Sequence, residues 1–238
     1  MTTAIVIAGG VGHRMEQKIP KQFINVYDKP VIIYTLESFQ KHPMVDSIVT
    51  VCLDGWHDVL KAYAGQFGIT KLTKIVPGGE TAQESIRNGV FALEGSCTDT
   101  DTVIIHDGIR PLVDAEVLTD VILKCQKYGN AVSALPYNEQ VFIRDDEVST
   151  TRYIPRETIR RVQTPQAYRF DRLLRAYQEA YSRKIGIYGS SYANTMMVEL
   201  GERLYFSAGS EKNIKLTTQD DLELFKVYLM AAKRGDLK

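Results

Sequence analysis

Short runs of β-branched residues alternate with longer segments of helical period over the first two thirds of this 238-residue chain. That alternation is typical of a parallel sheet covered by helices. The predicted strands are residues 4–7, 47–53, 74–76, 102–106 and 131–135. The predicted helices, identified by apolar residues at helical spacing, are residues 31–40, 82–93 and 114–128.

Residues 137–158 interrupt this alternation. The segment is polar, and the turn-like pair Asp145-Asp146 separates Val141-Phe142-Ile143 from a second run that begins at Val148. We therefore predict a β-hairpin arm that protrudes from the body of the fold. Because so polar a segment has little core of its own, we expect it either to extend across a second subunit of a homodimer or to be a solvent-exposed loop.

Regular structure resumes after the arm. The predicted elements are a helix over residues 170–181, a helix that ends near residue 200 and a strand over residues 204–208. A capping box formed by Thr218 and Asp221 predicts the start of a last helix. Since no repeat or low-complexity linker divides residues 1–238, we predict a single α/β domain, a Rossmann-like three-layer sandwich with a mostly parallel sheet.

The formal charge of the chain is zero, since 29 Lys and Arg residues balance 29 Asp and Glu residues. This balance argues against binding of nucleic acid or an anionic membrane, so any anion site must be local. No apolar run approaches the roughly 20 residues that span a bilayer, and no signal peptide is recognised, so we expect a cytoplasmic protein. Cys52, Cys97 and Cys125 lack metal-ligand and disulfide spacing and are expected to be reduced thiols.

A glycine-rich loop follows the first predicted strand and reads Ala8-Gly9-Gly10-Val11-Gly12. Without Cβ atoms, such a loop can curve so that successive backbone N–H groups converge on an anion. Arg14 and Lys21 add positive charge beside it. The loop leaves the carboxyl end of the strand, where ligands sit in open α/β sheets, so we predict a phosphate site here.

Alternative roles for the glycine loop fit its residues less well. A P-loop needs Lys-Ser or Lys-Thr after the glycines, and none is present. A nicotinamide dehydrogenase needs a third glycine where Met15 stands, an uninterrupted helix where Pro20 stands, and an acidic ribose ligand, for which Asp54 is the candidate. A tight turn that binds nothing stays open as an alternative, but it leaves Arg14 and Lys21 unexplained.

Five motifs lie along the chain in order. They are Ile7-Ala8-Gly9-Gly10-Val11-Gly12-His13-Arg14-Met15 with Pro20-Lys21-Gln22-Phe23, Gly78-Gly79 with Ser85, His106-Asp107-Gly108-Ile109-Arg110-Pro111, Gln163-Thr164-Pro165-Gln166, and Asn213-Ile214-Lys215-Leu216-Thr217-Thr218. Their order and spacing resemble those of the cytidylyltransferases that activate methylerythritol phosphate, ribitol phosphate and related alditol phosphates. Because the motifs span nearly the whole chain, the resemblance indicates the family, though not the substrate within it.

The resemblance assigns most of these residues to CTP. The backbone of Ala8, Gly9, Gly10 and Gly12, with the catalytic cations Arg14 and Lys21, would hold the triphosphate, and Lys215 resembles the Lys that contacts the α-phosphate. In the family the cytosine is held by backbone groups and a Ser hydroxyl. The matching positions here are Gly79, Glu80 and Ser85, although Ala82 stands where an Arg is usual.

Asp107 follows the predicted strand 102–106, so its carboxylate is expected at the same sheet edge as the glycine loop. There it can bind a Mg²⁺ ion that bridges phosphate oxygens, and a loop hydrogen bond is the alternative role. The resemblance implies that Arg110 binds the alditol phosphate. It also implies that Arg156 reaches an alditol phosphate from a neighbouring subunit, in a register left open by a few residues because other arginines lie nearby.

The acceptor is indicated by departures from the family pattern. Members that act on methylerythritol phosphate carry Asp-Thr with a nearby Lys at the start of the arm and Thr-Asp-Asp before the late helix. This chain has Glu139-Gln140-Val141-Phe142 and Tyr192-Ala193-Asn194 instead. We expect CMP transfer to a polyol phosphate such as ribitol or glycerol phosphate, giving a CDP-alditol for cell-surface polymers.

Two alternatives stay open. The four-residue gap between Met15 and Pro20 resembles that of the methylerythritol phosphate members more than that of the ribitol phosphate members, which often have one residue more, so methylerythritol phosphate stays open as the acceptor. The departures at Ala82 and at residues 192–194 leave room for a non-catalytic nucleotide-binding protein.

Overall fold

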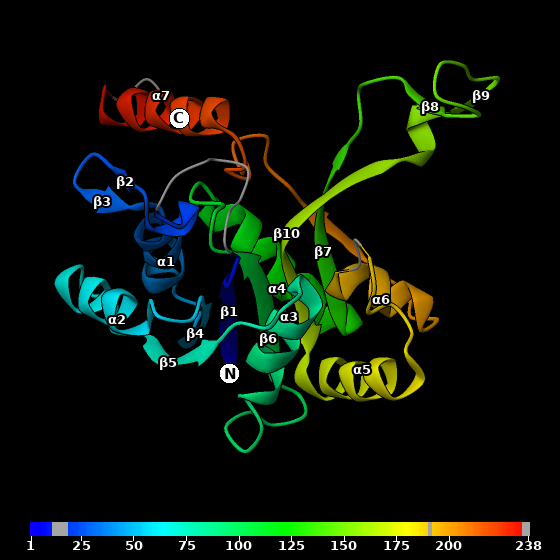
Figure 1. The fold of residues 1–238 in the computed structure, drawn as a ribbon. Helices are drawn as coiled ribbons and strands as arrows, with labels where there is room; N and C mark the ends of the chain where they lie inside the picture. Colours follow the sequence, from blue (N-terminus) through cyan, green and yellow to red (C-terminus); the bar gives the residue numbers. More distant parts are fainter. Residues whose placement is uncertain (11–18, 190–191, 235–238) are drawn as a thin grey trace.

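A single twisted sheet forms the centre of the molecule in the computed structural model, which describes residues 1–10, 19–189 and 192–234 (Figure 1). Its seven strands lie in the order β11-β7-β10-β6-β1-β4-β5. Their bounds are β1 (Thr2–Ala8), β4 (Ser47–Cys52), β5 (Leu72–Pro77), β6 (Thr102–Asp107), β7 (Asn130–Pro136), β10 (Arg160–Arg169) and β11 (Phe206–Ala208). Each strand predicted from the sequence is present, and the mostly parallel sheet is confirmed.

Helices cover both faces of this sheet, as the three-layer prediction requires. The bounds are α1 (Val31–Lys41), α2 (His57–Gln66), α3 (Ala82–Phe91), α4 (Ala115–Tyr128), α5 (Phe170–Arg183), α6 (Ala193–Glu199) and α7 (Gln219–Arg234). Ala4, Val6 and Ala8 of β1 pack in one core cluster with buried residues of α1, α2 and α4. Ile5 faces the other way and packs in a second cluster with α3, α5 and α6.

The strand β10 was not predicted, and it is the one strand of the sheet that runs antiparallel to both its neighbours, β6 and β7. Its register against β7 shifts between Val162 and Gln166, where Pro165 lies. A proline removes a ladder hydrogen bond and is found mainly at sheet edges and bulges, so the residue pattern argues against a central strand. The irregular register accommodates it.

The predicted hairpin arm is present and extends away from the sheet, at the top right of Figure 1. It contains β8 (Val141–Ile143) and β9 (Arg152–Ile154), which pair antiparallel, and the short 3-10 turn Arg156–Thr158. The second run was predicted to begin at Val148, but β9 begins only at Arg152. The Asp146 carboxylate accepts hydrogen bonds from the Val148 and Ser149 N–H groups at 2.8 and 2.9 Å, which keeps these residues in the turn. Thr151 N–H also donates to the Asp145 carboxylate at 2.7 Å, so the turn continues up to β9.

The sequence also predicted the capping box of the last helix and the reduced state of the cysteines. The capping box of α7 is confirmed, since Asp221 N–H donates to Thr218 Oγ1 at 3.2 Å and the Asp221 carboxylate accepts from Thr218 N–H at 2.7 Å. The three cysteines form no disulfide. Within the described ranges, no helix is both long and apolar enough to cross a membrane.

Candidate active site

A cavity of about 380 Å³ opens at the carboxyl ends of β1 and β6. Nine of the predicted site residues line it: Ala8, Gly9, Gly10, Lys21, Gly79, Glu80, Ser85, Asp107 and Lys215. The expected position at this edge of the sheet is therefore confirmed for loop residues 8–10 and for Asp107. Gly12 and Arg14 lie outside the described residues, and Arg110 and Arg156 are not part of the described lining.

Two glycine segments meet at the back of this cavity. A Cβ atom added to Gly9 would lie 3.1 Å from Ser85 Oγ and 3.3 Å from Gly78 Cα. One added to Gly79 would overlap the side chain of Glu84. Gly9 and Gly78 therefore allow close approach of the loop after β1 to the loop after β5, and Gly79 allows that second loop to pack against the start of α3.

The start of α3 fixes the polar groups of this wall. Thr81 Oγ1 accepts from Glu84 N–H at 3.1 Å and caps the helix, while the Glu84 carboxylate accepts from Glu80 N–H at 2.8 Å. The hydroxyl of Ser85 accepts from Gly79 N–H at 3.0 Å, which leaves its own O–H able to donate into the cavity. Ala82 also lines this wall and contributes only a methyl group.

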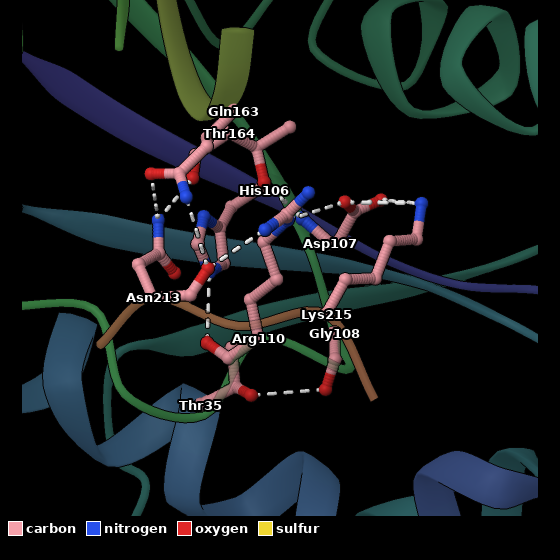
Figure 2. A network of polar contacts seen from close by, with 9 residues as sticks. All are labelled: Thr35, His106, Asp107, Gly108, Arg110, Gln163, Thr164, Asn213 and Lys215. Atoms are coloured by element: carbon pink, nitrogen blue, oxygen red, sulfur yellow. Dashed lines mark hydrogen bonds and ion pairs between the residues drawn. The ribbon is translucent and has the colours of Figure 1, made fainter. Parts of the chain in front are cut away.

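An ion-pair network stands at the opposite wall (Figure 2). The Asp107 carboxylate lies 3.2 Å from Lys215 Nζ and 2.9 Å from Arg110 Nε. Burial alone would raise the pKa of Asp107, but the charges of Lys215 and Arg110 outweigh that effect and lower the pKa to about 2. The carboxylate is therefore ionised at neutral pH, with one cation facing the cavity and one behind.

Backbone and buried side chains hold that network in place. Asp107 N–H donates to Thr164 Oγ1 at 3.1 Å, and the buried Asn213 amide donates to the Thr164 carbonyl at 2.7 Å. Leu216 N–H donates to the Ile109 carbonyl at 2.9 Å. The strand β10 and the segment before α7 are thereby fixed to the end of β6, which brings Lys215 to the cavity.

Arg110, predicted to bind the alditol phosphate, is engaged inside the protein. Its guanidinium donates to Asp107 and, at 2.7 Å, to the Asn213 carbonyl, and its side chain is only 13% exposed. The structure thus places Arg110 beside Asp107 and behind the cavity wall. Its contact with an acceptor phosphate stays a prediction.

Arg156 lies in the 3-10 turn of the arm, where its side chain is 53% exposed. One guanidinium nitrogen donates to the Asn138 carbonyl at 3.3 Å, and its charge lies 3.7 Å from the Glu157 carboxylate. Figure 1 shows the arm projecting from the body that holds the cavity. The contact of Arg156 with an acceptor phosphate of a neighbouring subunit stays a prediction.

Three contributors to the site were not identified as such from the sequence. Gln22 lines the cavity and hydrogen-bonds the glycine loop, Thr164 holds Asp107, and the Tyr192 ring centroid lies 5.5 Å from Lys215 Nζ. Gln22 and Thr164 each belong to one of the quoted motifs, which marked them as motif residues but did not indicate what they contact. Tyr192 was noted only as a departure from the family pattern.

A metal site made by the protein alone is absent from the described part of the chain, because no three His, Cys, Asp or Glu side chains converge there. Mg²⁺ commonly binds through one or two carboxylates together with substrate phosphates and water. Asp107, ionised and facing the cavity, fits a metal of that kind.

Comparison with known proteins assigns the family. The family model described as IspD, 2-C-methyl-D-erythritol 4-phosphate cytidylyltransferase, matches residues 2–231. The chain belongs to the IspD family of cytidylyltransferases. The resemblance inferred from the five motifs is thereby confirmed, and the nicotinamide dehydrogenase alternative is wrong.

Relatives within the IspD family carry two different names. A ribitol-5-phosphate cytidylyltransferase of Lacticaseibacillus paracasei is 59% identical over 229 residues, covering 96% of this chain and 98% of that protein. Another of that name, from Streptococcus agalactiae, is 35% identical and covers 100% of this chain and 99% of that protein. A 2-C-methyl-D-erythritol 4-phosphate cytidylyltransferase of Clostridium acetobutylicum is 34% identical, covering 93% of this chain and 94% of that protein.

Solved structures of the IspD family share the fold. The 4-diphosphocytidyl-2C-methyl-D-erythritol synthase of Anaerococcus prevotii superimposes with a TM-score of 0.82 at 24% identity, covering 96% of each chain. At that identity the likeness concerns the fold alone, and it confirms the predicted α/β architecture.

Proposed function

We propose that this chain transfers CMP from CTP to ribitol 5-phosphate, giving CDP-ribitol and pyrophosphate. The observation that carries the proposal is its 59% identity to a ribitol-5-phosphate cytidylyltransferase over nearly the full length of both proteins. The relative named for methylerythritol phosphate reaches 34%. Tyr192 and Ala193, which depart from the methylerythritol pattern, line the cavity, so they stand where they can contact an acceptor.

The chemistry is an in-line displacement at phosphorus. A phosphate oxygen of the acceptor forms a bond to the α-phosphorus of CTP, and the bond between that phosphorus and the bridging oxygen to the β-phosphate breaks. The electron pair leaves with pyrophosphate. A phosphate monoester carries a charge of roughly −1.5 to −2 at neutral pH, so the nucleophile arrives ionised and needs no general base.

The remaining difficulty is to bring two anions together and to stabilise the charge on the leaving group. We assign the loop backbone and Lys21 to the triphosphate and Lys215 to the α-phosphate, because both lysines line the cavity. Gly12 and Arg14 are assigned to the triphosphate on the sequence alone. Asp107 keeps Lys215 at the α-phosphate position through their 3.2 Å ion pair.

A magnesium ion is part of the proposal. Asp107 would hold it together with phosphate oxygens of CTP, and when bound it would neutralise charge on the triphosphate and the leaving pyrophosphate. The ion pair of Asp107 with Lys215 would then be shared with the metal. Arg110, 2.9 Å from the same carboxylate, would keep Asp107 ionised.

The functional unit we propose is a homodimer joined through the arm of residues 137–158. Support comes from exposed apolar side chains on the arm, among them Phe142, Ile143 and Tyr153 at 59, 39 and 63% exposure. Arg156 would bind the acceptor phosphate in the partner's cavity. We further propose that the enzyme works in the cytoplasm, where its three unpaired thiols would stay reduced.

Pyrophosphate release tests this function directly. The purified protein is incubated with CTP, Mg²⁺ and, in separate reactions, ribitol 5-phosphate, glycerol phosphate or methylerythritol phosphate. We expect the highest kcat/KM with ribitol 5-phosphate. A clear preference for methylerythritol phosphate would overturn the assigned acceptor, and CTP binding without release on any acceptor would favour a non-catalytic protein.

Replacing Lys21 by Ala tests the assigned site in the same assay. Removal of one preorganised cation from a phosphoryl-transfer site lowers turnover by about 10²-fold or more. Because Lys21 lies in a short surface turn and is half-buried, the variant should keep its melting temperature within a few degrees. Turnover like that of the wild type would contradict the role given to Lys21.

A further inference from the structure

The side chain of Gln22 is buried beneath the glycine loop and is 1% exposed. It belongs to the 3-10 turn Lys21–Phe23, directly beside Lys21. Its amide nitrogen lies 2.8 Å from the carbonyl oxygen of Ala8 and 3.0 Å from that of Gly10. An amide NH₂ has two N–H bonds, so both can be donated to this loop.

These two hydrogen bonds fix which way the loop backbone faces. In a trans peptide the C=O and the N–H of the next residue point in opposite directions. Holding the Ala8 carbonyl toward Gln22 therefore keeps the Gly9 N–H pointing away from Gln22. The Ala8 carbonyl also accepts from Leu53 N–H at 3.2 Å, which ties the same peptide to the end of β4.

The turn that carries Gln22 is itself anchored. Phe23 is 3% exposed and stacks on Trp56 with ring centroids 4.5 Å apart, and its N–H donates to the Pro20 carbonyl at 2.8 Å. The backbone of Gln22 is thus held by the packing of its neighbour Phe23. Lys21 belongs to the same turn and lines the cavity. The hydrogen bonds of Gln22 therefore also hold Lys21 close to the loop.

We propose that Gln22 is a positioning residue, which holds the backbone of residues 8–10 in the conformation that receives the nucleotide phosphates. This inference rests on the proposed function, since it takes CTP as the ligand. Gln22 acts through the loop and supplies no charge of its own. Its role needs a neutral side chain of this length with two donors, and glutamine alone among the common residues has that combination.

Replacements of similar length separate the effect of the two N–H donors of Gln22 from the effect of its side-chain shape. Gln22→Glu keeps the length, but when ionised it has no donor and faces two carbonyl oxygens. Gln22→Met keeps the length without charge or donors. Asn130→Asp is the matched control, because Asn130 is a buried amide that donates to the Arg203 carbonyl at 2.9 Å and lies at the amino end of β7, away from the cavity.

The decisive measurement is the affinity for CTP by calorimetry without acceptor, at a temperature where each protein is folded. We expect Gln22→Glu to weaken CTP binding at least tenfold, Gln22→Met to weaken it by a smaller factor, and Asn130→Asp to leave it unchanged although it lowers the melting temperature. In turnover, the KM for CTP should rise while the KM for the alditol phosphate stays constant.

The pH dependence distinguishes positioning from simple packing. A protonated Glu has one O–H to donate, so the affinity of Gln22→Glu relative to wild type should recover as pH falls from about 8 to about 5.5. The Met variant should show no recovery. If both variants bind CTP like the wild type, or if Asn130→Asp weakens binding equally, the inference is wrong.

The two proposals can fail separately. Since affinity is measured without acceptor, a protein that binds CTP through Gln22 but turns over no alditol phosphate would overturn the proposed function alone. A protein with normal turnover and no sensitivity to Gln22→Glu would overturn the positioning role alone.

Discussion

Three charges meet at the end of β6, where Asp107 lies between Lys215, 31% exposed, and Arg110, 13% exposed. The two cations have different surroundings. Lys215 faces the cavity, whereas Arg110 is bound on its far side to the Asn213 carbonyl. We infer that Arg110 keeps Asp107 ionised, and that Lys215 is the cation of this network that faces the nucleotide.

Replacement of Lys215 by Met tests that division of roles. Methionine keeps the apolar stem and removes the charge, so the α-phosphate would lose its cation and kcat should fall by about 10²-fold or more. The measurement is steady-state pyrophosphate release under saturating substrates. Lys61→Met, on the exposed face of α2, is the control and should retain wild-type kcat. A kcat within a few-fold of wild type in Lys215→Met would argue against the assignment.

The ring of Tyr192 should increase the contribution of Lys215 to kcat/KM. A cation near an exposed aromatic ring gains about 0.5–1 kcal/mol, which corresponds to about two- to fivefold in a rate or binding constant. Because the ring centroid lies 5.5 Å from Lys215 Nζ, Tyr192→Leu should lower kcat/KM by that factor, and Tyr192→Phe should stay near wild type. Tyr188→Leu, at a side chain 67% exposed and outside the cavity lining, serves as the control. Equal losses in the Phe and Leu variants would assign the effect to the hydroxyl and contradict a role of the ring.

Single residues differ in how far the sequence could assign them. The motif correctly places Ser85 and Gly79 at the cavity, because their positions depend on local geometry at the start of α3. The phosphate contact predicted for Arg110 stays a prediction, while its ion pair with Asp107, three residues away, was not identified from the sequence although that spacing allows it. Gln22 escaped prediction because its contacts depend on where the turn Lys21–Phe23 packs in three dimensions.

At the scale of elements, the proposed role of the arm makes each site depend on two chains. Within one chain Arg156 lies on an element that projects from the body, so the proposed dimer requires that it act in trans (Figure 1). A mixed dimer tests this point. It combines a Lys21→Ala chain with an Arg156→Ala chain, each carrying its own affinity tag.

The mixed dimer should regain activity that neither parent has. One of its two sites has its own Lys21 and receives Arg156 from the other chain, so we expect about half of the wild-type rate. The measurement is turnover of the doubly purified species. If Arg156 acts within its own chain, each site of the mixed dimer lacks one residue, and the rate would stay at the level of the parent variants.

Prediction at this scale failed where tertiary context overrides local pattern. The alternation of strands and helices correctly predicts the parallel part of the sheet, since each of those strands is short and is followed or preceded by a segment of helical period. β10 is an antiparallel strand of ten residues, and it contains Pro165 and the polar residues Gln163 and Gln166. Its place between β6 and β7 supplies the pairing that its composition does not suggest.

For the whole molecule, pH dependence of folding should centre on His106. Burial lowers the pKa of His106 from 6.5 to about 4, so between these values the unfolded chain binds a proton that the folded chain does not. Stability should therefore fall as pH drops through this window, by about 2 kcal/mol between pH 7 and pH 5. Asp107, whose folded pKa is about 2, stays ionised in both states over this range and contributes nothing there.

Denaturant unfolding at pH 7 and pH 5 measures this loss. His106→Gln keeps an N–H that can donate to the Arg110 carbonyl, which lies 3.1 Å from His106 Nε2. The variant should lose about 2 kcal/mol less than the wild type on acidification. His42, whose pKa burial also lowers, remains in both proteins and cancels in the comparison. An identical pH dependence in the two proteins would show that His106 does not govern it.

The two ends of the arm leave the sheet as neighbours, because Pro136 of β7 pairs with Arg160 of β10. The arm begins and ends on adjacent strands, so its length and composition can change without moving a residue of the sheet. The nucleotide wall, by contrast, is built from β1, the loop after β5 and α3. If the arm carries Arg156 to the acceptor as proposed, this part of acceptor recognition can change by insertion or deletion between residues 136 and 160, without moving the nucleotide wall or the acceptor-facing residues Tyr192 and Ala193.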